Sequence, residues 1–227
     1  LLSERYKFKR GKTFVVAEMS GNHGMSLKKA KKIILAAKRA GADAIKLQTF
    51  TADTITLDSN KKDFSLNHLK NNKKWRSYKT YYNLYKNNYT PWSWHKSLFK
   101  YARKNKLIIF SSPFDETAVD LLEKLKCPIY KIASPEITHI PLIKKVAKTG
   151  KPLMISTGLA NLKDISLAVK TAKSYGNSNI TLLKCNSTYP APIEESNLLN
   201  IQYLIKKFNL PCGLSDHTLD DLAAITS

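Results

Sequence analysis

Cysteine is scarce in this sequence, and its placement excludes two common kinds of stabilised scaffold. Three cysteines occur in 227 residues, and Cys127, Cys185 and Cys212 each lie in or beside an apolar run. None of them has a partner at the C-x-x-C spacing of a zinc site, and their positions do not indicate a disulfide framework. The cysteine content is therefore that expected of a protein in a reducing cytoplasm.

The sequence also lacks a long apolar run. No stretch reaches the roughly 20 apolar residues that a transmembrane helix needs, and no secretory apolar segment follows the basic start. Hydrophobic residues still make up 43% of the chain, which is enough to bury a core in one or two domains. We expect a soluble cytoplasmic protein with no membrane partner.

Acidic residues are few. The chain has 17 Asp and Glu against 38 Lys and Arg, a formal net charge of +21. Such a charge suggests nucleic acid or an anionic surface as a partner, but no zinc-finger spacing or RNA-binding aromatic motif accompanies it. Most lysines lie on the polar faces of helical patterns or in the tract from residue 70 to 86. We interpret them as a solvated surface that attracts small anions, and we expect no nucleic-acid partner.

Seven apolar runs of strand length recur along the chain, and an amphipathic helical pattern follows each of them. The expected strands are residues 13–17, 43–47, 107–110, 128–132, 152–155, 179–183 and 211–214. The expected helices are 26–40, with Ser26 as N-cap, 91–104, 115–125, 141–148, one from 161, 197–208 and one from about 219. Residues 49–90 lose this periodicity, and a stretch this long is usually a lid, a binding loop or irregular structure.

This alternation predicts an α/β fold with a parallel sheet, and the leading interpretation is a (β/α)8 TIM-type barrel. An open doubly wound sheet is the rival. It would be expected to carry a glycine-rich phosphate motif after its first strand, and residues 20–24 (SGNHG) match neither G-x-G-x-x-G nor the Walker pattern. A barrel typically needs about 250 residues and an eighth strand. We therefore expect residues 1–227 to be a single barrel domain that is incomplete after strand seven.

The carboxyl ends of parallel barrel strands meet on one face, so the polar residues that follow each strand are expected to form one site. That site would contain, in chain order, Glu18, Gln48, Ser112, Lys131, Ser134, Glu136, Ser156, Lys184, Ser187, Tyr189, Ser215, Asp216 and His217. Serine hydroxyls around a lysine suit a phosphate, which takes several donors and one compensating charge.

Each candidate also has a structural interpretation. A single serine at a strand end is more often a helix cap than a ligand, but three around Lys131 favour an anion site. Spacing alone leaves His217 open as a metal ligand or, with Asp216, as a helix cap. His23 follows the first strand and is either a site residue or structural. For the remaining histidines, His68, His95 and His139, a solvated or packed role is the better interpretation.

Several of these segments, taken in order, resemble the sialic acid synthase family. They are AE at 17–18, GNH at 21–23, ADAIKLQT at 42–49, SSPF at 111–114, YKIAS at 130–134, STG at 156–158, STYP at 187–190 and GLSDHT at 213–218. Residues 47–53, 111–114 and 184–190 are most similar to the pseudaminic acid synthases within that family.

The resemblance implies an enzyme, a transferase that condenses phosphoenolpyruvate with the open-chain aldehyde of an N-acetylated amino sugar. The product would be a nine-carbon nonulosonic acid, with pseudaminic acid favoured over N-acetylneuraminate or legionaminate, and phosphate would be released. The family uses a divalent metal, Mn²⁺ or Mg²⁺, and its members continue into an eighth strand with a second metal histidine. An antifreeze-like domain and a homodimer also belong to the family pattern, and no such domain lies within residues 1–227.

Matching positions imply a role for each residue. Phosphoenolpyruvate would be held by Ser112, Lys131, Ser134, Ser156, Ser187 and Ser215. His217 would ligate the metal, with Asp216 close enough to orient its ring. The sugar and the proton transfers would be served by Glu18, Gln48, Glu136 and Tyr189.

Two other classes of protein also fit parts of the sequence. A Schiff-base aldolase would place a lysine at a barrel strand end, but it needs that lysine neutral in an apolar pocket, and the neighbouring serines favour a charged one. A non-catalytic polyanion binder would use the +21 charge, and its affinity would fall steeply with salt.

Overall fold

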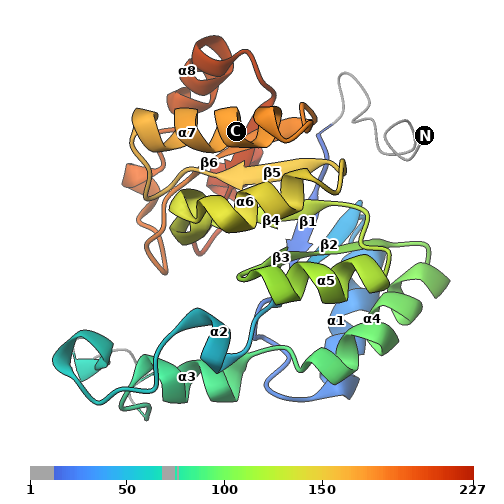
Figure 1. The fold of residues 1–227 in the computed structure, drawn as a ribbon. Helices are drawn as coiled ribbons and strands as arrows, with labels where there is room; N and C mark the ends of the chain where they lie inside the picture. The colour runs from blue at the N-terminus through green and yellow to red at the C-terminus, as the bar shows by residue number, and fades with distance from the viewer. Residues whose placement is uncertain (1–12, 68–74, 76) are drawn as a thin grey trace. The chain divides into compact units, whose positions relative to one another are not determined.

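The computed structural model describes residues 13–67, 75 and 77–227 (Figure 1). Packing divides this part of the chain into two compact units, the first from residue 13 to 127 and the second from 128 to 227. Each unit consists of parallel strands covered by helices. The expected position of His68 lies outside the described residues.

The first unit has three parallel strands, in which β2 pairs with β1 on one side and with β3 on the other. The strands are β1 (Val16–Glu18), β2 (Ala44–Thr49) and β3 (Ile108–Pro113). Its helices are α1 (Leu27–Arg39), α2 (Ala52–Ile55), α3 (Tyr81–Asn88), α4 (Trp92–Lys104) and α5 (Glu116–Lys124), with a 3₁₀ turn at Lys62–Phe64. Ser26 caps α1 as expected, because its side chain accepts a hydrogen bond from the Lys29 backbone N–H.

The second unit has four parallel strands in the order β4-β5-β6-β7, namely β4 (Tyr130–Ile132), β5 (Leu153–Ser156), β6 (Ile180–Cys185) and β7 (Cys212–Ser215). Its helices are α6 (Ile140–Ala147), α7 (Leu162–Ser174), α8 (Leu199–Phe208) and α9 (Leu222–Thr226), with 3₁₀ segments η3 (Ser134–Thr138) and η4 (Ile193–Glu195). Helices α6 and α7 pack side by side (Figure 1). The α7 N-terminus is closed by Asn161 and Asp164, which form a capping box.

Within each unit the strands stand in the order of the sequence, and helices separate one strand from the next. A doubly wound sheet reverses its strand order at a switch point. Sequential order with a helical crossover is the arrangement of the (β/α)8 barrel. The predicted fold class is therefore confirmed.

The stretch from residue 50 to 89 contains regular structure that its sequence pattern did not predict. Helices α2 and α3 lie in it, and Ser65 forms a single antiparallel bridge with Thr80. Thr80 also caps α3, because its hydroxyl accepts from the Asn83 backbone N–H. Leu84 is the buried residue of α3, so this helix has almost no apolar periodicity for a sequence pattern to reveal.

Strand β4 is buried along its whole length. Tyr130 and Ile132 are fully buried, and Lys131 between them is only 9% exposed. Burial on both faces is typical of a parallel sheet covered by helices. A lysine in this position must meet a polar partner or a ligand, because an isolated buried charge is costly.

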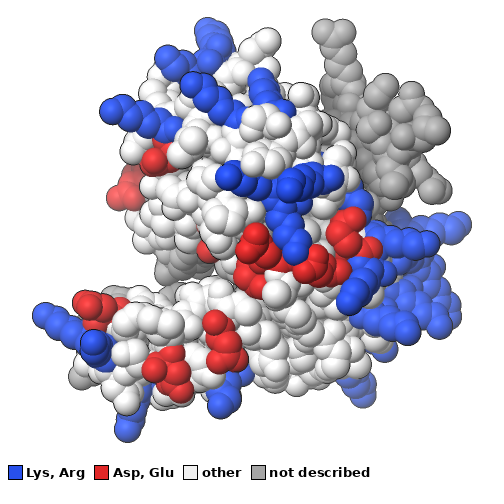
Figure 2. Space-filling view, in the orientation of Figure 1, with Lys and Arg blue, Asp and Glu red and all other residues white. Residues whose placement is uncertain are grey.

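Lysine and arginine side chains gather over α1 and α4, as Figure 2 shows for this face. These two helices pack together, and neither contains an acidic residue. Their exposed cations are Lys28, Lys29, Lys32, Lys38, Arg39, Lys96, Lys100, Arg103 and Lys104. This agrees with the prediction that lysines occupy exposed helix faces. Among the described helices, none is both long enough and apolar enough to span a membrane.

Candidate active site

A buried polar cluster lies at the carboxyl ends of β4 and β5 in the second unit. Lys131 comes from β4, Ser134 from the 3₁₀ segment directly after it, and Ser156 ends β5. Pro135 ends the strand pattern and stands near the start of the 3₁₀ segment. The Ser134 hydroxyl accepts a hydrogen bond from the Gly158 backbone N–H at 3.1 Å, which ties the loop after β4 to the loop after β5.

Two polar atoms in this cluster are buried without a hydrogen-bond partner, the Ser156 hydroxyl and one carboxylate oxygen of Glu136. An unpaired buried polar atom costs free energy, and native structures contain few of them. Lys131 also interacts electrostatically with Glu136. The lysine cation and the unpaired hydroxyl offer an anionic ligand a charge and a donor, and the Glu136 carboxyl would have to be protonated to donate to the same ligand.

Glu136 is held in a state that suits proton transfer. Burial raises the pKa of its carboxyl group to about 7, although its own backbone N–H and the Lys131 ammonium favour the charged form. A group whose pKa lies near neutrality can both donate and accept a proton at physiological pH. A proton-transfer role for Glu136 would require a pKa in this range.

His217 is oriented by a backbone carbonyl. Its Nδ1 lies 2.6 Å from the Asn186 carbonyl oxygen, and a carbonyl only accepts, so Nδ1 carries the proton. In a neutral ring the Nε2 lone pair then remains available for a metal. The Tyr189 ring packs on the imidazole with 4.2 Å between ring centroids, although much of Tyr189 is exposed.

Asp216 does not orient this ring, contrary to expectation. Its two carboxylate oxygens accept hydrogen bonds from the backbone N–H and the hydroxyl of Thr218, both at 3.0 Å. It therefore closes a local turn. The cap of α9 is Asp221, so Asp216 and His217 do not cap that helix either.

Cys185 forms a second contact of His217. Its sulfur lies 3.8 Å from His217 Nδ1 and 3.8 Å from the Ser187 hydroxyl. Burial raises the pKa of the Cys185 thiol, but hydrogen bonds with His217, Ser134 and Ser187 outweigh it and bring that pKa to about 7. For His217, burial lowers the pKa and the contacts with Cys185 and Asn186 raise it above its usual value. Cys185 thus joins the serine cluster to His217.

Ser215 occupies the end of β7 beside this group. It is the register partner of Cys185 in the pairing of β6 with β7 and is half-buried. The second unit therefore brings Lys131, Ser134, Glu136, Ser156, Ser187, Tyr189, Ser215 and His217 to the ends of its four strands and the loops that follow them.

The backbone at Gly158 has no room for a side chain, and we expect Gly158→Ala to destabilise the second unit. A Cβ there would clash with the Ser187 hydroxyl and would lie 3.1 Å from both the carbonyl oxygen and the sulfur of Cys185. Ser187 can rotate away, but the Cys185 backbone is fixed in β6. We expect a loss of about 1–3 kcal/mol, as for other overpacked sites, measured by urea unfolding. Gly213→Ala is the control, because its new Cβ would lie 3.4 Å from a methyl of the flexible Leu183 side chain. A loss of stability in Gly213→Ala as large as that in Gly158→Ala would refute the overpacking explanation.

The first unit brings together the other expected residues. Glu18 ends β1, forms an ion pair with Lys46, and accepts a hydrogen bond from the Ser20 backbone N–H at 3.0 Å. The Ser20 hydroxyl donates to the Gln48 side-chain oxygen at 3.1 Å. Gln48 is the register partner of Ser112 across β2 and β3, and the buried Ser112 hydroxyl has no hydrogen-bond partner.

Lys46 is a site candidate that sequence reasoning missed. It is buried, it precedes Gln48 by two residues and it is the register partner of Glu18. Side chains two apart on a strand share a face, so the choice of Gln48 already implied that Lys46 points the same way. Asn186 and Cys185 were also missed, and a backbone carbonyl contact such as that of Asn186 leaves no signal in the sequence.

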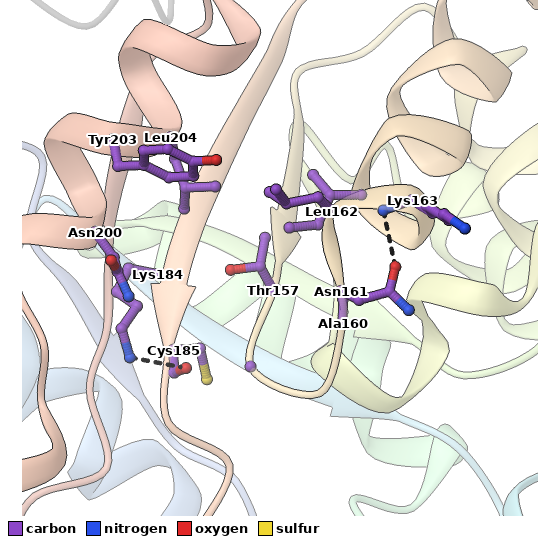
Figure 3. Close-up of a pocket in the computed structure, with 12 residues that line it drawn as sticks. Thr157, Ala160, Asn161, Leu162, Lys163, Lys184, Cys185, Asn200, Tyr203 and Leu204 are labelled. Atoms are coloured by element: carbon purple, nitrogen blue, oxygen red, sulfur yellow. Dashed lines mark hydrogen bonds between the residues drawn. The ribbon is translucent and has the colours of Figure 1, made fainter.

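Lys184 lines a pocket in the second unit (Figure 3). The pocket has a volume of about 740 Å³ and lies between the loop after β5, the start of α7, and α8. Its lining includes Thr157, Asn161, Tyr203 and Leu204, and Lys184 Nζ donates to the Cys185 carbonyl at 3.2 Å. Gly158 and Cys185, which contact Ser134 and Ser187, also line this pocket, so Lys184 lies beside the serine cluster.

No group of three His, Cys, Asp or Glu side chains that could hold a metal occurs in the part of the chain that the structure describes. His217 Nε2 fits the role of one protein ligand.

The fold has close counterparts among solved structures. The N-acetylneuraminic acid synthetase of Leptospira borgpetersenii, solved with citrate, superposes with a TM-score of 0.78 at 28% identity, covering 93% of this chain and 67% of that one. Residues 33–227 match the model of the NeuB family. The chain therefore belongs to the NeuB family.

Two curated relatives from the same family match most of the chain. The pseudaminic acid synthase of Helicobacter pylori is 44% identical over 211 residues, 93% of this chain. The N,N'-diacetyllegionaminic acid synthase of Campylobacter jejuni is 39% identical over 210 residues, 91% of this chain. The chain spans 61% of the length of each of these relatives.

Proposed function

We propose that the protein that carries this chain condenses phosphoenolpyruvate with the open-chain aldehyde of an N-acetylated amino sugar. The products would be a nine-carbon nonulosonic acid and phosphate, and pseudaminic acid is the favoured product. Membership of the NeuB family supports the reaction class. Higher identity to a pseudaminic acid synthase than to a legionaminic acid synthase, 44% against 39%, supports the choice of product.

The observation that carries the proposal is the buried cluster of Lys131, Ser134 and Ser156. One cation and two hydroxyls, one of them unpaired, offer a phosphate or carboxylate the donors that it needs. Ser187 and Ser215 stand at the ends of the neighbouring strands and would complete the donor set. Ser112 in the first unit offers a further unpaired hydroxyl.

The reaction forms one carbon–carbon bond and one carbon–oxygen bond to water, and it breaks the C2–O bond to phosphate. C3 of the enol attacks the aldehyde carbon of the sugar, and the aldehyde oxygen takes up a proton. Water adds to the resulting cationic C2 and loses a proton. The tetrahedral intermediate then expels phosphate, and its C2 hydroxyl gives up its proton to the leaving phosphate to form the 2-keto acid. Glu136, with its pKa of about 7, is the group we assign to these proton transfers. We assign Glu18, Gln48 and Tyr189 to the sugar.

A divalent cation, Mn²⁺ or Mg²⁺, is part of the proposal. The fixed Nδ1–H tautomer of His217 leaves its Nε2 lone pair for such an ion. When bound, a divalent cation supplies Lewis-acid polarisation of an aldehyde oxygen. Asn186 and Cys185 would hold the imidazole in place.

The test is product formation by the full-length protein encoded by the gene. It would be incubated with phosphoenolpyruvate, Mn²⁺ and each of three acceptors, the precursors of pseudaminic, legionaminic and N-acetylneuraminic acid. Phosphate release and mass spectrometry of the sugar acid would identify the acceptor. Absence of phosphate release with all three acceptors would refute the proposed function.

Lys131→Met should weaken phosphoenolpyruvate binding about tenfold to a hundredfold, since a charge-assisted contact is worth roughly 1.5–3 kcal/mol. Methionine keeps the buried stem and removes only the charge. Calorimetry with phosphoenolpyruvate would measure the effect, and Lys170→Met, at an exposed position of α7, is the control. Equal affinity in both variants would refute this role. Borohydride trapping of Lys131 with a carbonyl substrate would instead indicate a Schiff-base aldolase.

A further inference from the structure

Two histidines of the first unit are completely buried and belong to separate polar networks. His23 follows β1, and its Nε2 lies 3.1 Å from the Thr90 hydroxyl. His95 lies in α4, and its Nε2 lies 2.9 Å from the Thr49 hydroxyl. The proposed reaction uses neither histidine directly.

Their two partners border the same stretch of chain. Thr49 ends β2 and directly precedes residues 50–89, and Thr90 directly follows them. One further hydrogen bond joins the start of this stretch to the rest of the first unit, since Trp92 Nε1 donates to the Phe50 carbonyl at 3.1 Å. The buried bonds of Thr49 and Thr90 thus hold the residues on either side of the stretch.

The hydrogen bonds assign one protonation state to each imidazole. His95 Nδ1 lies 3.1 Å from the Pro91 carbonyl oxygen, so Nδ1 donates and Nε2 accepts from the Thr49 hydroxyl. His23 Nδ1 accepts from the Met25 backbone N–H, so its Nε2 donates to Thr90. Burial lowers the pKa of His95 to about 4 and also lowers that of His23. Both rings are therefore neutral near pH 7.

The His95 network continues to the strand that carries Ser112. Once Thr49 donates to His95, its oxygen accepts from the Ser111 hydroxyl at 2.7 Å. Gln48 precedes Thr49, and Ser112 follows Ser111, so the two hydroxyl residues of the network each adjoin a site residue. Neighbouring side chains on a strand point to opposite faces. The network therefore holds β2 and β3 from the face opposite to Gln48 and Ser112.

We propose that His95 is a positioning residue of the candidate active site. Through Thr49 and Ser111 it fixes the ends of β2 and β3, and with them Gln48 and the Ser112 hydroxyl. This proposal rests on the proposed function. A site holds its substrate only when its groups stay within about 0.5 Å of the productive geometry, and the Ser112 hydroxyl depends on its strand for its position, because it has no hydrogen-bond partner.

The test compares three changes in the full-length enzyme. His95→Leu removes both ring nitrogens, His95→Gln keeps an amide able to reach Thr49, and Thr49→Val removes the hydroxyl while keeping the shape. We expect His95→Leu and Thr49→Val each to raise KM for phosphoenolpyruvate about tenfold while kcat changes less than about threefold. His95→Gln should recover most of this loss. Leu98→Ala, a core change in the same helix, is the control, which should lower the melting temperature and leave KM unchanged.

The outcomes separate the two proposals. If the wild-type enzyme makes no sugar acid with any acceptor, the proposed function is wrong and this inference falls with it. If the wild type turns over and both His95→Leu and Thr49→Val keep its KM, the positioning role alone is overturned. A KM that rises equally in Leu98→Ala would also overturn it, because the effect would then be one of stability. Thr49→Val keeps the test decisive where His95→Leu does not fold.

Discussion

His217→Ala is expected to abolish sugar-acid formation and to weaken Mn²⁺ binding by more than about a hundredfold. Changing only an outer partner of a metal-bound histidine typically costs ten- to a hundredfold in metal affinity, so loss of the ligand itself should cost more. Phosphoenolpyruvate binding should change little, because the proposed site holds it through Lys131 and the serines. Calorimetry with Mn²⁺ and then with phosphoenolpyruvate measures both on the full-length protein.

Asp216→Asn is the matched control for this change. Asp216 bonds to Thr218 and not to the imidazole, so this variant should keep metal affinity and turnover. The melting temperature of each variant distinguishes a loss of folding stability from a loss of metal binding. If His217→Ala melts early yet binds Mn²⁺ and turns over like wild type, His217 is a structural residue and the ligand hypothesis is wrong.

The strand-and-helix alternation was predictable because each buried strand is a short apolar run bounded by proline, glycine or polar residues. The predicted end of strand 152–155 falls one residue short of the end of β5 at Ser156, and predicted strand 128–132 ends with β4 at Ile132. The apolar core of α4 was equally visible, because its buried residues recur at helical spacing. Ser26 was identifiable as a cap from residue type and position alone.

Other features depend on contacts between distant segments. His95 was interpreted as a solvated or packed histidine, and the structure shows it packed, but its bond to Thr49 spans 46 residues and leaves no local pattern. The orientation of His217 depends on the backbone carbonyl of Asn186, 31 residues away, and any residue type there supplies a carbonyl. The last helix begins at Leu222 rather than near residue 219, because Asp216, Asp220 and Thr218 form a turn before it.

Glu136→Gln is expected to lower turnover by about a hundredfold to ten-thousandfold, the usual contribution of a general acid or base. Glutamine has nearly the same shape and cannot exchange a proton, so phosphoenolpyruvate affinity should stay within about threefold of wild type. Steady-state kinetics together with calorimetry separate the two quantities. A variant that turns over normally would show that another group transfers the proton.

The same substitution should change how stability depends on pH. Burial raises the pKa of Glu136 from 4.5 to about 7, so between these values the folded protein holds a proton that the unfolded chain has lost. Stability conferred by this group is therefore complete below about pH 4.5, falls as pH rises to about 7, and stays constant above it. The free energy of unfolding of Glu136→Gln, relative to that of wild type, should therefore rise by on the order of 1–3 kcal/mol from pH 4 to pH 8. Urea unfolding at both pH values measures this gain. Glu194→Gln, at an exposed position, is the control for loss of one acid. A gain in Glu136→Gln no larger than that of the control would mean that the Glu136 carboxyl is not desolvated in the folded protein.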